Sequence, residues 1–107
     1  MTRPGLTAMT KIEVVVNGDD VAEVGEVLTT CGATGYTVLS GVSGLGHRGL
    51  HQGRLHFNDR DALRIVLTVV PDERSDGVIS SLRAFLEDRP GVLFVSDTYV
   101  SRPEYFS

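Results

Sequence analysis

The feature that most constrains this chain is the order of its apolar segments, which alternate between two periodicities. Runs rich in β-branched residues, typical of strands, occur at 11–16, 36–42, 62–70 and 92–100. Between them, residues 21–31 and 78–86 carry apolar side chains at helical spacing. The resulting order, β-α-β-β-α-β, predicts an α+β fold in which a four-stranded antiparallel sheet carries two helices on one face.

The strands of this ferredoxin-like sandwich also predict an assembly. Its helices cover one face of the sheet and leave the other face open. Here the strands are apolar on both sides, since Val14 and Val16 flank Val15, and Ile65 precedes Val66. Strands of this kind are typical of sheets that are buried on both faces. We therefore expect the uncovered face to pack against other copies of the chain.

Length, charge and cysteine content narrow the classes of protein that fit. The 107 residues make one domain, which we place at 10–107 after a disordered tail at 1–9. A net charge of −4 argues against nucleic-acid binding, which needs clustered positive charge. The single cysteine, Cys31, fits a cytoplasmic location. Because Cys31 lies on the apolar stripe of its helix, we expect it to be a core residue and not a nucleophile.

The segment 43–60 is the strongest candidate for a functional loop. It is too long and too polar for a tight turn, and long inserts in compact domains are usually functional. Its chemistry-bearing residues are Gly44, Gly46, His47, Arg48, His51, Arg54 and His56. Glycines let backbone N–H groups approach an anion closely, and the neighbouring cations add positive charge. The segment therefore predicts anion binding, while its three histidines leave a metal site as the alternative.

These segments together resemble the PII signal-transduction superfamily, over nearly the whole domain from Lys11 to about Glu104. The matching motifs are Lys11-Ile12-Glu13, Thr34-Gly35-Tyr36-Thr37-Val38, Gly44-Leu45-Gly46, Gly91-Val92-Leu93-Phe94-Val95 and Arg102. They resemble, in order, the first strand, the start of the second strand, the base of the T-loop, the end of the B-loop and a C-terminal phosphate-binding arginine. The glycine-rich T-loop, at about 43–60, and the C-terminal tail resemble the divergent branch that includes carboxysome-associated PII-like proteins.

This resemblance implies a function. PII-like proteins are regulatory trimers that bind adenine nucleotides in the clefts between subunits. For the divergent branch, the resemblance implies that ADP or AMP is bound in preference to ATP, that bicarbonate is a further ligand, and that no metal is required. It also implies that the T-loop contacts a partner protein or transporter in inorganic-carbon or nitrogen metabolism. The implied nucleotide-binding residues are Thr37, Val38, Gly44, Gly46, His47, Arg89, Gly91, Val92 and Arg102, and the implied anion contacts of the T-loop are Arg48, His51 and Arg54.

The T-loop lacks the tyrosine that nitrogen-regulatory members modify, which argues against regulation by uridylylation. Two alternatives stay open. One is a trimeric metal-binding protein of the divalent-cation-tolerance type, which would use His47, His51 and His56. The other is a small ferredoxin-like enzyme, which is the weaker hypothesis because the sequence offers no Ser-His-Asp set, no pair of buried carboxylates with a plausible role and no cofactor motif.

Overall fold

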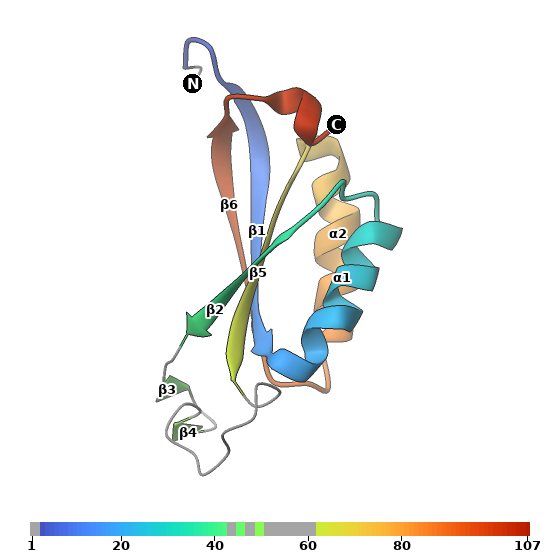
Figure 1. Cartoon of the computed structure of the whole chain (residues 1–107). Helices are drawn as coiled ribbons and strands as arrows, with labels where there is room; N and C mark the ends of the chain where they lie inside the picture. Colours follow the sequence, from blue (N-terminus) through green and yellow to red (C-terminus); the bar gives the residue numbers. More distant parts are fainter. Residues whose placement is uncertain (1–2, 43–44, 47–48, 51–61) are drawn as a thin grey trace.

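The computed structural model of the chain describes residues 3–42, 45–46, 49–50 and 62–107 (Figure 1). The elements are β1 (Thr7–Asn17), η1 (Gly18–Asp20), α1 (Val21–Thr30), β2 (Thr37–Val42), β3 (Leu45–Gly46), β4 (Gly49–Leu50), β5 (Leu63–Val70), α2 (Asp72–Phe85), β6 (Val92–Val100) and η3 (Pro103–Tyr105). The main elements follow the predicted β-α-β-β-α-β order, so the predicted fold class is confirmed. In the described ranges, no helix is long and apolar enough to cross a membrane.

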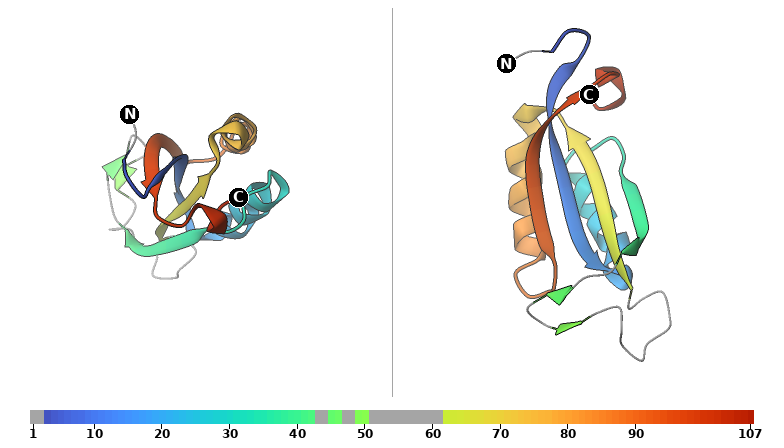
Figure 2. Two further views of the ribbon diagram at one scale, coloured as in Figure 1. Left: turned by 90° about the horizontal axis from the view of Figure 1, so that it is seen from above. Right: turned by 90° about the vertical axis from the view of Figure 1, so that its left-hand side faces the viewer.

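The four long strands form one antiparallel sheet in the order β2-β5-β1-β6. Helices α1 and α2 lie side by side on the same face of this sheet (Figures 1 and 2). Strand β1 begins at Thr7, so the predicted disordered tail is wrong for residues 7–9. The cause is tertiary, because the last residues of β6 extend the ladder and pair Thr7 with Val100 and Met9 with Thr98.

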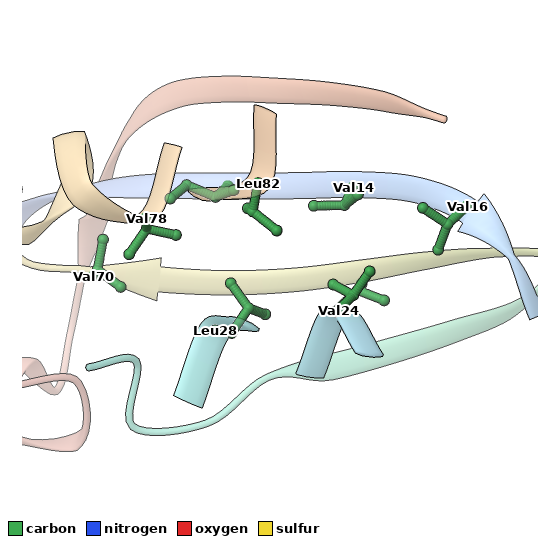
Figure 3. Close-up of a cluster of buried hydrophobic side chains, with 9 residues drawn as sticks. Val14, Val16, Val24, Leu28, Val70, Val78 and Leu82 are labelled. Atoms are coloured by element: carbon green, nitrogen blue, oxygen red, sulfur yellow. The ribbon is translucent and has the colours of Figure 1, made fainter. Parts of the chain in front are cut away.

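The core lies between the sheet and the two helices (Figure 3). Its fully buried side chains are Ile12, Val14, Val16, Val24, Leu28, Val66, Val70, Val78 and Leu82. They alternate along the strands and recur every three to four residues along the helices, as the periodicities predict. Cys31 packs against this cluster, which agrees with the expected core role.

The face of the sheet away from the helices carries exposed apolar side chains that nothing in the described part of the chain covers. Residues directly opposite each other in a ladder share a face, and Leu39, Val92 and Phe94 stand opposite Ile65, Val15 and Glu13. Those partners alternate with buried core residues, so they point away from the helices. Leu39, Val92 and Phe94 are 44, 47 and 55% exposed. The single chain thus leaves open the face that we expected other copies to cover.

Gly77 offers a stability test that does not touch the candidate site. It lies inside α2, and a Cβ added there would have nothing within 4 Å. Gly77→Ala should raise the free energy of unfolding by roughly 0.5–1 kcal/mol, because alanine loses less backbone entropy in a helix. Gly25→Ala in α1 is the matched control, since its Cβ would collide with the Tyr36 hydroxyl. Urea unfolding at equal protein concentration compares them, and equal effects of the two substitutions would contradict the prediction.

Candidate functional site

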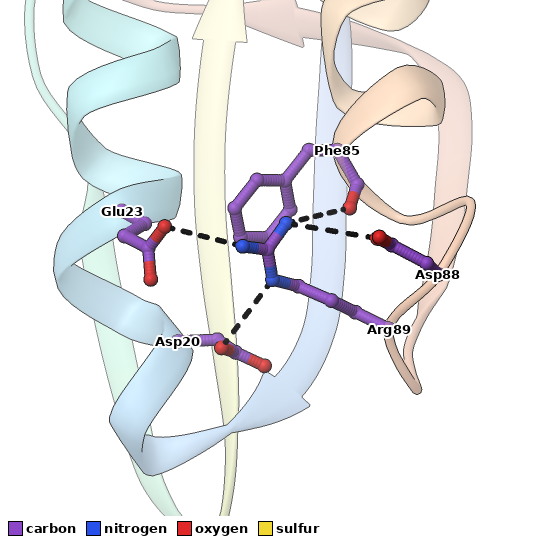
Figure 4. A network of polar contacts seen from close by, with 5 residues as sticks. All are labelled: Asp20, Glu23, Phe85, Asp88 and Arg89. Atoms are coloured by element: carbon purple, nitrogen blue, oxygen red, sulfur yellow. Dashed lines mark hydrogen bonds and ion pairs between the residues drawn. The ribbon is translucent and has the colours of Figure 1, made fainter.

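Arg89, just beyond α2, ties the two helices together (Figure 4). Its Nη2 lies 3.3 Å from Glu23 Oε2, and its Nε lies 3.9 Å from Asp20 Oδ1. Its Nη1 donates a hydrogen bond of 3.1 Å to the Phe85 carbonyl, and its guanidinium lies 4.1 Å from the centre of the Phe85 ring. Burial raises the pKa of the Asp20 carboxyl, Asp19 raises it further, and Arg89 opposes the rise. The Arg89 charge is therefore already matched by carboxylates of its own chain.

Gly91 has a structural role at the start of β6. Its φ is +155°, a backbone angle that residues other than glycine rarely adopt. An added Cβ would lie 2.8 Å from Leu86 Cδ2 and 2.9 Å from the Val15 carbonyl oxygen. The backbone after Arg89 therefore passes close against β1, and this approach fixes where the B-loop segment meets the sheet.

Arg102, after the end of β6, is held by an aromatic neighbour. Its Nη1 donates a hydrogen bond of 2.9 Å to the Tyr105 hydroxyl, and its guanidinium lies 5.6 Å from the centre of the same ring. The described part of the chain gives Arg102 no carboxylate partner, in contrast to Arg89. Because a guanidinium carries five N–H donors, most of the donors of Arg102 stay available for an anion.

Three different elements fix the segment that leads into β2. Thr34 Oγ1 donates a hydrogen bond of 2.8 Å to the carbonyl oxygen of Tyr105, and the buried Thr68 of β5 donates one of 2.6 Å to the carbonyl oxygen of Gly35. The Tyr36 ring lies against Gly25 of α1. A Cβ at Gly35 itself would meet nothing within 4 Å, so its surroundings give no steric reason for a glycine there.

The two arginines of the candidate site lie far apart within one chain. Arg89 and Gly91 precede β6, and Arg102 follows it, so the nine-residue strand from Val92 to Val100 separates them. At about 3.3 Å per residue, this strand spans roughly 25 Å. Figures 1 and 2 place the two ends of β6 at opposite ends of the sheet. One phosphate can therefore contact both groups only if they come from two different chains.

A comparison with protein families matches residues 9–105 to the family of the nitrogen regulatory protein P-II. The chain belongs to the P-II family. This finding confirms the resemblance that the sequence motifs indicated. No curated protein sequence matches the chain significantly.

Solved structures of P-II-like proteins match almost the whole chain. One is CPII, a nitrogen regulatory PII-like protein from Thiomonas intermedia K12, bound to ADP, AMP and bicarbonate. It is 34% identical, with a TM-score of 0.87, and the match covers 94% of this chain and 95% of CPII. A second CPII structure, bound to ADP, AMP and acetate, is 31% identical with a TM-score of 0.75, and covers 94% and 96%. A PII-like signalling protein from Thermus thermophilus, 17% identical, matches in fold alone with a TM-score of 0.78 over 95% and 98%.

The structure of this P-II chain describes some of the predicted site residues and not others. Thr37 and Val38 begin β2, where Thr37 lies on the open face and Val38 on the helix side. Gly46 lies in the two-stranded β3–β4 ladder, opposite Gly49. The predicted contacts Gly44, His47, Arg48, His51 and Arg54 lie outside the described residues.

None of the predicted nucleotide contacts lines the hollow between α1 and α2, although Glu23 and Phe85, two contacts of Arg89, do. That hollow, of about 320 Å³, is lined by Glu23, Glu26, Val27, Thr30, Cys31, Ser81 and Phe85. The candidate site and this hollow are therefore separate features.

The structure brings to Arg102 one residue that was not among the predicted site residues. This residue, Tyr105, follows Arg102 by three positions, and Pro103 starts the turn between them. Residues three apart in a 3₁₀ turn lie above one another, and η3 spans Pro103–Tyr105. The spacing Arg-Pro-Glu-Tyr therefore carried a usable signal.

Proposed function

We propose that this P-II chain is the subunit of a homotrimeric regulatory protein, and not an enzyme, that binds an adenine nucleotide in the clefts between subunits. ADP and AMP are the preferred nucleotides, bicarbonate is a further ligand, and no metal is required. The segment 43–60 acts as the T-loop and carries the signal to a partner protein or transporter in inorganic-carbon or nitrogen metabolism.

The observation that best supports a site between subunits is the distance between Arg89 and Arg102, which lie at opposite ends of β6. Arg102 of one subunit and the Arg89–Val92 segment of the next can meet at a phosphate only across an interface, because β6 holds them apart within a chain. Backbone N–H groups beside Gly91 and the guanidinium of Arg102 are suitable donors for phosphate oxygens. Arg89 is the weaker contributor, because a phosphate has to compete with Glu23 and Asp20 for it.

The identity of the ligands is supported by the relatives. CPII structures that match nearly the whole chain hold ADP and AMP together with either bicarbonate or acetate. Both of these small ligands are anions with a planar pair of oxygens, which suit an arginine-containing site. Phosphate contacts that order a loop are a known means of switching, because the ligand stabilises one conformation of the loop.

The trimer is supported by the open face of the sheet. Leu39, Val92 and Phe94 expose about half of their surface there, and a contiguous apolar patch of this kind marks an interaction surface. The metal-binding alternative depends on His47, His51 and His56, which lie outside the described residues, and no observation on the rest of the chain favours it. Among the described side chains, no group of three or more His, Cys, Asp or Glu comes together in a metal-binding arrangement.

Calorimetric titration with ADP, AMP and ATP, each with and without bicarbonate, tests this proposal together with the mass in solution. We expect a trimer that binds ADP or AMP in the micromolar range and binds ATP more weakly, with an effect of bicarbonate on nucleotide affinity. A trimer that binds none of the nucleotides would overturn the sensor function, and a monomer would overturn the inter-subunit site.

A further inference from the structure

Two hydrogen bonds at the C-terminal turn connect Arg102 and Tyr105 with Thr34, which is distant in the sequence. Arg102 donates to the Tyr105 hydroxyl at 2.9 Å, and Thr34, 71 positions before Tyr105, donates to the Tyr105 carbonyl at 2.8 Å. Tyr105 thus contacts the guanidinium through its side chain and the segment that leads into β2 through its backbone. Tyr105 is 58% exposed, so packing in the core does not account for its position.

We propose that Tyr105 and Thr34 are positioning residues for Arg102, which set the guanidinium in the orientation that a nucleotide phosphate requires. The inference rests on the proposed function and deepens it, because it explains how a surface arginine becomes a prepared anion ligand. A free arginine side chain loses much rotamer entropy when a ligand immobilises it. A hydroxyl and a ring that hold the guanidinium beforehand reduce that loss.

The same contacts connect the phosphate end of the site to β2. Thr34 lies two residues before Tyr36 and three before Thr37, one of the implied nucleotide-binding residues. The carbonyl of Gly35 is fixed separately by the buried Thr68. The hydrogen bond from Thr34 therefore joins the turn that carries Arg102 to the segment that leads into β2, which Thr68 holds through the Gly35 carbonyl.

A double-mutant cycle on the full chain tests the positioning role, with ADP as the titrated ligand. The four proteins are the wild type, Tyr105→Phe, Arg102→Ala and the double variant, and ADP is raised far enough to measure the weakened site. Tyr105→Phe keeps the ring and removes the hydroxyl. We expect it to weaken ADP binding roughly threefold to tenfold when Arg102 is present, and less than about twofold when Arg102 is absent. Thr34→Val should follow the same pattern with a smaller loss.

Tyr99→Phe is the matched control, because Tyr99 is another tyrosine with an arginine near its ring, Arg3 at 5.4 Å. It should change the ADP affinity less than about twofold. The melting temperature and the mass in solution of every variant report separately on the fold. If Tyr105→Phe binds ADP like the wild type, or loses the same factor with and without Arg102, the positioning role is overturned while the proposed function stands. If the wild type itself does not bind ADP, the proposed function and this inference both fail.

Discussion

Arg102→Ala should weaken ADP binding by about 10- to 150-fold, which corresponds to about 1.5–3 kcal/mol for one charge-assisted contact. Arg102 donates a hydrogen bond to the Tyr105 hydroxyl, and the described residues offer it no carboxylate. Its charge is therefore available to the phosphate of a bound nucleotide. Isothermal titration of the protein with ADP measures the change, and the fold should be unaffected because the side chain is exposed.

Two further substitutions sharpen this experiment. Arg102→Lys keeps the charge but loses the planar, bidentate geometry, so it should recover only part of the affinity. Arg89→Ala removes a cation that Glu23 and Asp20 already engage, so it should cost less affinity than Arg102→Ala. An ADP affinity that is unchanged in Arg102→Ala would remove this residue from the site, and a larger loss in Arg89→Ala would make Arg89 the main phosphate ligand.

Gly91→Ala should lower the free energy of unfolding by about 2–4 kcal/mol, because it combines overpacking with backbone strain. The new Cβ would lie 2.8 Å from Leu86 Cδ2 and 3.2 Å from Val16 Cγ1, and the φ of +155° would be unfavourable for any side chain. The Val15 carbonyl on the third side, at 2.9 Å, is backbone and cannot move aside without disturbing β1. Urea unfolding at one fixed protein concentration measures the loss, since unfolding of an oligomer depends on concentration.

Gly35→Ala provides the control for Gly91→Ala. The substitution is chemically the same, but the added Cβ has nothing within 4 Å and the backbone is not in the left-handed region. We expect a change in stability within about 0.5 kcal/mol. If Gly91→Ala were as harmless as Gly35→Ala, the close approach of the B-loop segment to β1 would not be needed for stability, and the phosphate contact would be the better reason for that glycine.

For Gly91 and Arg89, the sequence and the structure point to different roles of the same residue. Gly91 stands in a segment that resembles the B-loop, and the sequence therefore suggested a contact to phosphate. The structure adds a steric requirement that involves Leu86, Val15 and Val16, which no local pattern connects with Gly91. Arg89 was assigned to the same site, yet its guanidinium bridges Glu23 and Asp20, because the crossover brings α1 beside α2.

The sequence by itself determined the order of the elements, their type and the residues of the core. These follow from local properties, since alternation at positions such as Ile12, Val14 and Val16 and helical spacing at Val78 and Leu82 depend only on near neighbours. Tertiary structure alone decided that β1 starts at Thr7, that Thr34 bonds to Tyr105, and that Glu23 and Asp20 engage Arg89. The physical reason is that each of these depends on pairing between segments distant in the chain, and no periodicity within one segment carries that information.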